Sequence, residues 1–253
     1  MAELATVPAY DGLPGAALAE LLALPRVTLL EEVGSTMDVA HELASAGAPA
    51  GTLVLANAQR AGRGRAGRRW SAEPGAGIWF TLIERPNDPR AVEVLSLRVG
   101  LRVARALDRF APVTVGLKWP NDLYLLGGKL GGILVETRWR DGRPDWVAIG
   151  VGVNVRPPRE IRGAAALGGG AARPEILGEL IPAVRAAAAG RGPLAEREVR
   201  EFGRRDIAAG RVCRLPQPGR VAGIADDGAI VIVTATGPVH CREGSLVLEG
   251  DPP

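Results

Sequence analysis

The spacing of apolar residues along this 253-residue chain predicts alternating helices and strands. Apolar side chains over residues 91–109 recur every three or four positions, as they do on one face of an α-helix. Ser35 is a typical helix N-cap, and Gly47 follows the expected end of the helix that Ser35 begins. We expect helices over residues 16–24, 35–46, 91–109, 174–189 and 193–204.

Strands are expected where short apolar runs are bounded by turn-forming residues. Gly127 and Gly128 separate two such runs and indicate a β-hairpin. Residues 60–77 and 159–173 are rich in glycine and show no periodicity, so we expect loops there. The expected strands in this part of the chain cover residues 27–31, 52–58, 78–83, 113–118, 122–126, 130–138 and 146–155.

The pattern changes after Gly210, where short β-like runs alternate with turn dipeptides. A succession of short strands predicts a small β-barrel. We therefore predict an α+β protein with a larger domain over residues 1–204, built on a mixed or antiparallel sheet with helices, and a small all-β domain over residues 205–253. The expected barrel strands cover residues 211–215, 220–224, 229–235, 238–242 and 246–248.

Composition and charge indicate an ordinary globular protein, with 47% hydrophobic and 23% charged residues. The net charge of +3 suits an anionic substrate but is too small to indicate nucleic-acid binding. Cys213 and Cys241 lie in apolar runs, without the spacing of a metal site, and are interpreted as buried small side chains. Neither a signal peptide nor a membrane-spanning segment is evident, so we expect a cytoplasmic protein.

Lysine is almost absent, since Lys118 and Lys129 are the only lysines among 31 basic residues. Such a bias suggests that a compact ammonium group is retained at two positions where a guanidinium does not serve. The alternative is chance.

Two segments offer groups that could bind a polar or anionic ligand. Ser35 and Thr36 stand at an expected helix N-terminus, where hydroxyls and free amides can bind a ligand, although helix capping alone explains the serine. Residues 59–70 combine glycines with arginines and end in Trp70, which suits a loop closing over a phosphate and a flat ring. This loop lacks the following helix of a dinucleotide-binding motif, and a solvated basic loop or a nucleic-acid-binding segment remains an alternative.

Two further segments contain both lysines and a polar position in an apolar strand. Asn121 and Asp122 follow an expected strand end, and an amide beside a carboxylate suits Mg²⁺ held with nucleotide phosphates as well as an ordinary turn. In the predicted hairpin, Lys118 and Lys129 come from adjacent strands and could converge on one anion. Asn154 interrupts a strand in which glycines alternate with β-branched residues, and it needs hydrogen-bond partners if it is buried.

Taken together and in this order, these segments resemble the biotin protein ligase family. The resemblance implies a class II synthetase-like catalytic domain followed by an SH3-like C-terminal domain. It also implies that biotin and Mg-ATP form biotinyl-5′-AMP, and that biotin is then transferred to a lysine of a biotin carboxyl carrier domain. The matching motifs are G-S-T at 34–36, Q-x-x-G-R-G-R-x-G-R-x-W at 59–70, K-W-P-N-D at 118–122, G-K-L-x-G-I-L-x-E at 128–136 and G-V-G-V-N-V at 150–155.

The resemblance assigns a role to each matching residue. The residues implied to bind biotin or biotinyl-AMP are Ser35, Thr36, Gln59, Arg63, Gly64, Arg65, Lys129, Gly131 and Gly132. Those implied on the nucleotide side are Trp70, Lys118, Asn121, Asp122 and Asn154, with Asp122 as the Mg²⁺ ligand. The implied catalytic residues are Lys129, which contacts the biotin carboxylate and the α-phosphate as they join, together with Arg63, Arg65 and Lys118.

Some features depart from the family pattern or fall outside it. Met37 stands where many relatives carry Asn or Gln, and it could tune the biotin pocket. Residues 1–25 are too few for the helix-turn-helix domain of some relatives, so we expect no specific DNA binding. We also expect no membrane association, because no apolar stretch is long enough to span a bilayer. Relatives include monomers and sheet-to-sheet dimers, which makes a homodimer one expectation. No general base for the transfer step is evident, because His41 and His240 lie outside the motifs and are interpreted as surface or core histidines.

Three alternatives compete with this hypothesis. A lipoate or octanoate ligase shares the fold but needs a long apolar channel, whereas the arginine-rich segment favours biotin. A non-catalytic biotin-responsive regulator or nucleic-acid binder is disfavoured by the short N-terminus. A degenerate binding protein is disfavoured because both lysines and Asp122 are present.

Overall fold

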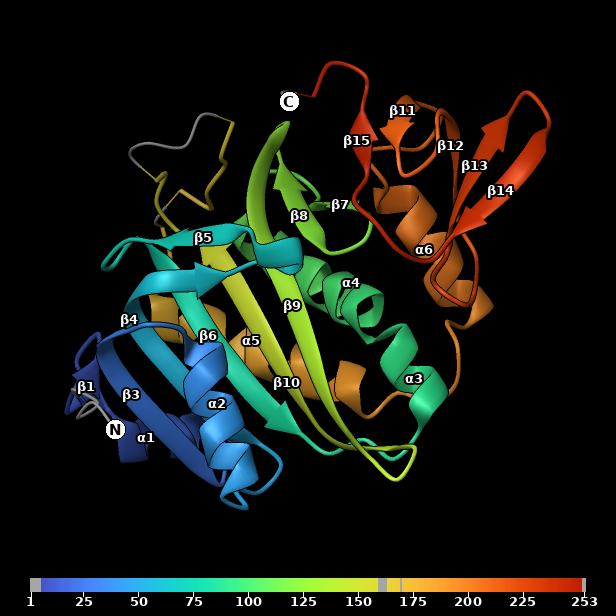
Figure 1. Cartoon of the computed structure of the whole chain (residues 1–253). Coiled ribbons are helices and arrows are strands. Elements are labelled where there is room, and N and C mark those ends of the chain that lie inside the picture. The colour runs from blue at the N-terminus through green and yellow to red at the C-terminus, as the bar shows by residue number, and fades with distance from the viewer. Residues whose placement is uncertain (1–5, 159–162, 169, 252–253) are drawn as a thin grey trace.

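The computed structural model describes residues 6–158, 163–168 and 170–251. The loop expected over residues 159–173 therefore falls partly outside the described residues. The described part of the chain forms a mixed α+β fold (Figure 1), as the sequence pattern predicts.

The described residues form a central eight-stranded sheet with the strand order β3-β4-β6-β10-β9-β8-β7, and β5 pairs with β4 off this path. The pairing of β3 with β4 is parallel, and the other pairings in this sheet are antiparallel. The strands are β3 (Arg26–Val33), β4 (Thr52–Arg63), β5 (Arg69–Ala72), β6 (Gly77–Glu84), β7 (Gly116–Lys118), β8 (Asp122–Leu125), β9 (Gly128–Arg140) and β10 (Arg143–Asn154). Two short strands near the N-terminus, β1 (Ala9–Tyr10) and β2 (Leu13–Pro14), pair with each other.

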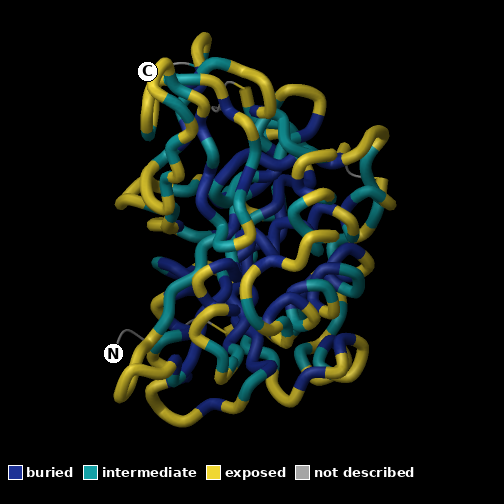
Figure 2. The backbone as a smooth tube through the Cα atoms, turned by 90° about the vertical axis from the view of Figure 1, so that its right-hand side faces the viewer, coloured by how far each residue is buried: buried dark blue, intermediate teal, exposed yellow. Residues whose placement is uncertain are grey.

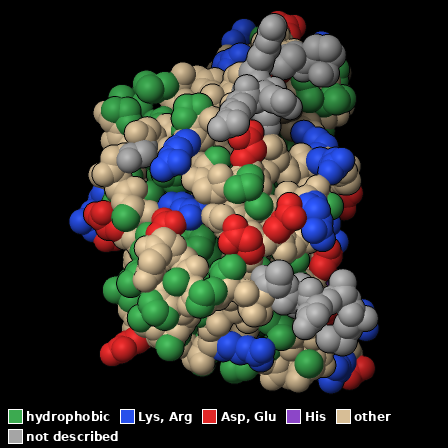
Figure 3. All heavy atoms as spheres, turned by 90° about the vertical axis from the view of Figure 1, so that its left-hand side faces the viewer, with side chains coloured by type: hydrophobic (Ala, Val, Ile, Leu, Met, Phe, Trp, Pro, Cys, Tyr) green, Lys and Arg blue, Asp and Glu red, His purple; other side chains and the backbone are tan. Residues whose placement is uncertain are grey.

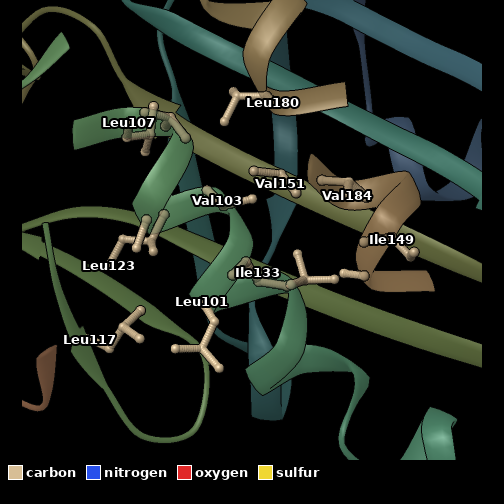
Figure 4. Packing of buried hydrophobic residues seen from close by; sticks show 14 of the residues in the cluster. Leu101, Val103, Leu107, Leu117, Leu123, Ile133, Ile149, Val151, Leu180 and Val184 are labelled. Carbon is tan, nitrogen blue, oxygen red and sulfur yellow. The ribbon is translucent and has the colours of Figure 1, made fainter. Parts of the chain in front are cut away.

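The helices cover the two faces of this sheet unequally (Figure 1). One face packs against α1 (Gly15–Leu21), α4 (Leu95–Leu107) and α5 (Arg173–Ala188), and these elements share the larger apolar cluster. Figure 4 shows part of that packing, in which Ile133, Ile149 and Val151 from the strands meet Val103 and Val184 from the helices. The opposite face packs against α2 (Thr36–Ser45) through a smaller cluster. The remaining helices are α3 (Pro89–Glu93) and α6 (Glu196–Arg205), with 3₁₀ turns at Arg65–Gly67 and Asp108–Phe110.

The alternation of side chains along a strand explains how one strand serves both faces. In β10, Ile149 and Val151 lie in the larger cluster, whereas Trp146 and Ala148 lie in the smaller one under α2. The buried residues are concentrated in these central strands, and the exposed residues are concentrated in the connections between elements (Figure 2). Figure 3 shows one side of the molecule, on which acidic and basic side chains are interspersed, so that neighbouring charges offset one another's field.

A second, five-stranded antiparallel sheet lies in the C-terminal part of the described chain. Its core residues Val221, Ile230 and Leu248 belong to the same apolar cluster as α4 and α5, and β12 packs against α6, so the apolar cores of the two regions are continuous. The indole Nε1 of Trp119 donates to the Gly228 carbonyl oxygen at 3.0 Å across the junction. The strands are β11 (Val212–Leu215), β12 (Gly219–Ile224), β13 (Ile230–Thr234), β14 (Gly237–Cys241) and β15 (Val247–Leu248).

Two expected elements differ from the structure. The loop expected over residues 60–77 is largely a hairpin, because β4 continues to Arg63 and pairs with β5, placing Gly62 opposite Trp70. A Cβ atom at Gly62 would lie 2.6 Å from the Trp70 carbonyl oxygen, which accounts for glycine at this close approach. The single helix expected over residues 91–109 is divided into α3 and α4 at Val94, whose backbone (φ −102°, ψ 6°) leaves the helical region.

Candidate active site

A cavity of about 490 Å³ opens on the α2 face of the large sheet, beside the N-terminus of α2. Three glycines of β9 and β10, Gly132, Gly150 and Gly152, line it and leave space where side chains would stand. A Cβ atom at Gly152 would lie 2.8 Å from Trp70 Nε1, and one at Gly150 would lie 2.8 Å from Met37 Cε. These glycines therefore allow side chains from other elements to cover the strands closely.

Buried polar groups form one wall of the cavity at the start of α2. Ser35 caps the helix, since its Oγ accepts from the Met37 amide at 3.3 Å. Thr36 donates to Gln59 Oε1 from both its amide (2.8 Å) and its Oγ1 (3.1 Å). Because Thr36 Oγ1 donates to Gln59, the 2.9 Å contact between Thr36 Oγ1 and Thr81 Oγ1 makes Thr81 the donor. Gln59 Oε1 is thus engaged, and its Nε2 is free to present N–H groups to a ligand.

Residues 59–72, which run from the end of β4 through β5, form a segment that we call the arginine hairpin. Ala66 and Gly67 at its tip have positive φ values of 54° and 71°, a backbone conformation that reverses the chain and that glycine adopts most easily. Near the tip, Arg65 donates to the Gly244 carbonyl oxygen at 3.5 Å. Arg68 donates to Ser245 Oγ, so the hairpin reaches the C-terminal sheet region. Burial, together with the neighbouring Arg68 charge, lowers the pKa of the Arg65 guanidinium.

Arg63, which pairs with Arg69 directly before the tip of the arginine hairpin, is held on the other side of the cavity. Arg63 Nη2 lies 3.0 Å from Asp38 Oδ1 on α2 and 3.2 Å from Glu136 Oε2 on β9. Trp70 lies over Gly132 and Gly152 and meets Trp79 edge to face, with ring centroids 6.2 Å apart. The hairpin thus covers the glycine-lined floor with an indole ring.

Both lysines line the cavity, and each is paired with a carboxylate. Lys129 Nζ lies 2.6 Å from Asp122 Oδ1 and 5.4 Å from the centre of the Trp70 ring. Lys118, only 8% exposed, lies 2.6 Å from Asp251 Oδ2. The two cations are therefore held at this end of the cavity by partners that a phosphate group could replace.

The two carboxylates also affect a neighbouring phenol. Burial, with the Asp122 and Asp251 charges, raises the pKa of Tyr124 to about 12, so Tyr124 stays neutral. Burial on its own would raise the pKa of Asp251, but the hydrogen bonds from Lys118 and the Leu248 amide, together with nearby positive charge, outweigh it and hold that pKa below its usual range. Asp251 is therefore ionised at neutral pH.

Most of the residues expected from the sequence lie together at this cavity. Gly131 and Asn154 do not line it. A Cβ atom at Gly131 would lie 2.6 Å from the Gly152 carbonyl oxygen, so this glycine serves strand packing. Asn154 donates to the Ala165 carbonyl oxygen at 3.0 Å and to that of Lys129 at 3.4 Å, which fastens the backbone behind Lys129. The expected residues that line the cavity are Ser35, Thr36, Gln59, Arg63, Gly64, Arg65, Trp70, Lys118, Asn121, Asp122, Lys129 and Gly132.

Other lining residues were not expected from the sequence. Thr81 could have been found, because it is a hydroxyl within the apolar run of residues 78–83. Asp251 carried no signal, since it stands 133 residues from the lysine that it contacts. Arg68 and Tyr124 lie inside recognised motifs or directly after them, but nothing in their spacing set them apart.

The carboxylates of the cavity do not form a metal cage. Within residues 6–158, 163–168 and 170–251, no three His, Cys, Asp or Glu side chains are close enough to hold a metal ion. Asn121 donates from Nδ2 to the Ile133 carbonyl oxygen at 2.7 Å, which leaves its amide oxygen available beside Asp122. This donor set fits Mg²⁺ that is bound mainly through substrate phosphates, because Mg²⁺ commonly takes only one or two protein carboxylates.

The cavity as a whole suits a small ligand with one neutral polar end and one anionic end. Hydroxyl and amide groups gather at the α2 end, and lysine and arginine side chains gather at the other. The volume is in the range of small-molecule sites. In the described part of the chain, no helix has the length and apolar character needed to cross a membrane.

Comparisons with known proteins give one family. A sequence profile described as the biotin/lipoate A/B protein ligase family matches residues 29–154. A biotin–[acetyl-CoA-carboxylase] ligase of Mycobacterium tuberculosis is 33% identical over 246 residues, which cover 86% of this chain and 90% of that protein. The bifunctional ligase/repressor BirA of Bacillus spizizenii is 43% identical over 124 residues, which cover 49% of this chain and 38% of that relative. The chain thus spans less than half the length of this relative.

Solved structures agree with the sequence comparisons. The biotin protein ligase from Aquifex aeolicus in complex with biotin and ATP has a TM-score of 0.73 and 25% identity, covering 89% of this chain and 99% of that chain. The biotin protein ligase from Leishmania major in complex with biotinyl-5-AMP has a TM-score of 0.56 and 27% identity, covering 85% of this chain and 98% of that chain.

Proposed function

The chain belongs to the biotin protein ligase family, and we propose that it joins biotin to ATP as biotinyl-5′-AMP and then transfers biotin to a lysine of a biotin carboxyl carrier domain. One observation carries the proposal: the family-motif residues of the α2 N-terminus, the arginine hairpin, β7–β8 and β9 line a single cavity. The names of the Mycobacterium relative and of the ligand-bound Aquifex and Leishmania structures support the same activity.

The proposed biotin end is the α2 wall. Ser35, Thr36 and Gln59 supply hydroxyl and amide groups for the ureido ring, and Thr81 orients the Thr36 hydroxyl. Gly132 and the hairpin residues Arg63 to Arg65 line the space between this wall and the lysines. Met37 supplies an apolar wall next to Gly150, where many relatives carry a polar side chain.

The proposed nucleotide end contains Trp70, Lys118, Asn121, Asp122 and Lys129. Asp122 and the Asn121 amide oxygen would hold Mg²⁺ together with the nucleotide phosphates, and the ion would neutralise phosphate charge there. Trp70 offers a ring face beside the adenylate. Asn154 acts on this end indirectly, through the backbone of Lys129.

The first step brings two anions together. An oxygen of the biotin carboxylate forms a bond to the α-phosphorus, and the bond from that phosphorus to the pyrophosphate oxygen breaks. Lys129, with Arg63, Arg65 and Lys118 at the cavity wall, offsets the negative charge that accumulates. Fixing both reactants in one cavity replaces an encounter in solution.

The second step releases AMP. The neutral amine of the acceptor lysine bonds to the acyl carbon, the acyl C–O bond to AMP breaks, and the amine proton passes to solvent or to the leaving phosphate. The arginine hairpin covers the site and limits access of water to the mixed anhydride before this step.

The domain organisation and cellular setting are part of the same proposal. The catalytic domain covers residues 1–204, with its boundary at the last turn of α6, and residues 205–253 form an SH3-like domain. The acceptor is a carrier domain of a biotin-dependent carboxylase in the cytoplasm. We expect no specific binding to DNA or to membranes, and a homodimer through sheet edges is compatible with the fold.

A lipoate or octanoate ligase is the nearest competing activity. The polar groups at the closed end of the cavity favour a ureido ring over an acyl chain, because unfilled buried donors and acceptors are costly. A non-catalytic regulator would not need both lysines at the nucleotide end.

The deciding experiment is calorimetric titration of the protein with biotin and, separately, with lipoate, followed by thin-layer detection of biotinyl-AMP from labelled ATP. Biotin binding without lipoate binding, together with adenylate formation, is expected. Lipoate binding in place of biotin would retain the fold and overturn the substrate. Biotin binding without any adenylate in Mg-ATP would identify a binding protein.

A further inference from the structure

A continuous series of side-chain contacts runs from Trp146 on β10, through His41 in the middle of α2, to the arginine hairpin. Trp146 Nε1 lies 3.2 Å from His41 Nδ1, and His41 Nε2 lies 2.9 Å from Glu136 Oε2. The same Glu136 oxygen lies 3.2 Å from Arg63 Nη2. These contacts therefore join β10, α2 and β9 to Arg63 of the hairpin that covers the cavity.

The directions of these hydrogen bonds follow from their chemistry. An indole N–H can only donate, so His41 Nδ1 must accept from Trp146. The proton of a neutral His41 is then on Nε2, which donates to Glu136. Glu136 accepts from His41 and from Arg63 and is held on both sides.

The position of Glu136 on its strand points it toward the cavity face. Gly132, Leu134 and Glu136 share one face of β9 through the alternation of the strand, and the first two line the cavity. Ile133 borders the cavity as well, but its side chain packs in the larger apolar cluster. Glu136 thus stands one step beyond the cavity in the same row. Its carboxylate reaches Arg63 from the sheet, opposite Asp38 on α2.

We propose that Glu136, oriented by His41, is a positioning residue that holds Arg63 and the arginine hairpin closed over the cavity. A free arginine side chain has many rotamers, and anchoring it before the ligand binds removes part of the entropy cost of closure. This inference rests on the proposed function for its kinetic consequence, but its structural consequence can be measured without any ligand.

The test compares Glu136→Gln with a matched control, Glu32→Gln. Glu32 also pairs with an arginine of β4, since its Oε2 lies 3.2 Å from Arg60 Nη1, but this pair does not contact Arg63. Trypsin cleavage after Arg63 and Arg65 in the ligand-free protein reports hairpin opening. We expect cleavage about fivefold faster in Glu136→Gln than in the wild type, and an unchanged rate in Glu32→Gln. His41→Phe should produce a smaller increase in the same direction.

The kinetic arm uses a double-mutant cycle. Glu136→Gln should raise the KM for biotin and the release rate of biotinyl-AMP about fivefold, with little change in melting temperature. In an Arg63→Ala background, Glu136→Gln should add nothing, because the carboxylate acts through Arg63.

The possible results distinguish the positioning role of Glu136 from the proposed ligase function. Wild-type cleavage rates in Glu136→Gln, or a full effect of Glu136→Gln in the Arg63→Ala background, would overturn the positioning role. A wild-type protein that forms no biotinyl-AMP would overturn the proposed function alone, because the cleavage arm still measures whether Glu136 anchors the hairpin.

Discussion

Strands β9 and β10 carry two different surfaces on their two faces. On the core face, Ile133, Ile149 and Val151 are nearly fully buried against α4 and α5. On the cavity face, Gly132 and Gly152 have no side chains, and the Trp70 ring packs directly over the strand backbone.

The difference between the two faces shows how one pair of strands can provide both the rigid core and the ligand space. Branched aliphatic side chains fix the strand backbone from below, and the omission of side chains above creates the ligand space. Because the same backbone carries both faces, groups mounted on it are held more firmly than groups on loops. Substitutions on the cavity face should change activity, and substitutions on the core face should change stability.

The largest effect is expected at Lys129. Lys129→Ala should reduce biotinyl-AMP formation on the order of 10²–10³-fold, because the variant loses the charge closest to Asp122 and the proposed phosphate position. Lys129→Arg should lose most of the activity too, since a guanidinium differs in shape from an ammonium. Pyrophosphate-exchange rates and melting temperatures would be measured together. Arg138→Ala, at the exposed end of the same strand, is the control; near-normal adenylation in Lys129→Ala would remove this residue from the mechanism.

A substitution on the core face should lower stability and leave the activity of the folded protein unchanged. Ile149 is fully buried in the larger cluster, and Ile149→Ala should destabilise the protein by about 3 kcal/mol through lost burial and a cavity. Urea denaturation would give the change in the free energy of unfolding. The rate of adenylation per folded molecule should stay close to that of the wild type; a large loss of that rate would mean that the two faces are not separable.

Gly152 tests the cavity face without removing a charge. In Gly152→Val the new side chain would meet Trp70, and we expect adenylation to fall about 30-fold because the hairpin cannot close correctly. Gly150→Ala is the milder comparison, since the closest atom to its Cβ would be the flexible end of Met37. Steady-state kinetics of both variants would show whether their order is as expected; equal effects would mean that the Trp70 position is unimportant.

The smallest effect concerns a carboxyl outside the cavity, next to β7. Burial raises the pKa of Asp206 to about 6, and the Ala208 amide offsets only part of that rise. The folded state therefore binds this proton more tightly than the unfolded state, so stability falls as pH rises from about 4 to about 6.

Asp206→Asn should remove this penalty. We expect it to raise stability by about 1–2 kcal/mol at pH 7.5 and to have little effect at pH 4, since the Asn oxygen can still accept from Ala208. Melting temperatures at the two pH values give the comparison. An equal change at both pH values would assign the effect to packing rather than to ionisation.

Local signals were sufficient for most of the fold. The hydrophobic alternation of β9 and β10, their turn residues and the Ser35 cap predicted elements that the structure confirms. The arginine hairpin was expected to be a loop, because its glycines and arginines show no strand periodicity, and the contact that places Trp70 over Gly152 joins residues distant in sequence. No local pattern in the hairpin contains that information.

The candidate site was predictable only where it lies in motifs. Lys118 and Lys129 stood out through the scarcity of lysine, and they line the same cavity. His41 was interpreted as a surface or core residue, yet it contacts Glu136 across 95 positions of sequence. Asp251 reaches Lys118 from the C-terminal sheet region. The His41–Glu136 and Lys118–Asp251 pairs arise from tertiary packing, which the local sequence does not encode. The roles assigned to the motif residues stay predictions.

The use of arginine in place of lysine would limit reaction of the protein with the adenylate of the proposed function. An acyl adenylate is an electrophile that labels neutral amines, whereas a guanidinium retains its proton and is a poor nucleophile. The two lysine amines lie against Asp122 and Asp251 at the cavity, and every other basic side chain counted in the sequence is an arginine. If the proposed reaction takes place, a surface of this composition would offer escaping adenylate almost no side-chain amine to acylate, so the protein would be protected from labelling itself and the carrier lysine would remain the preferred acceptor.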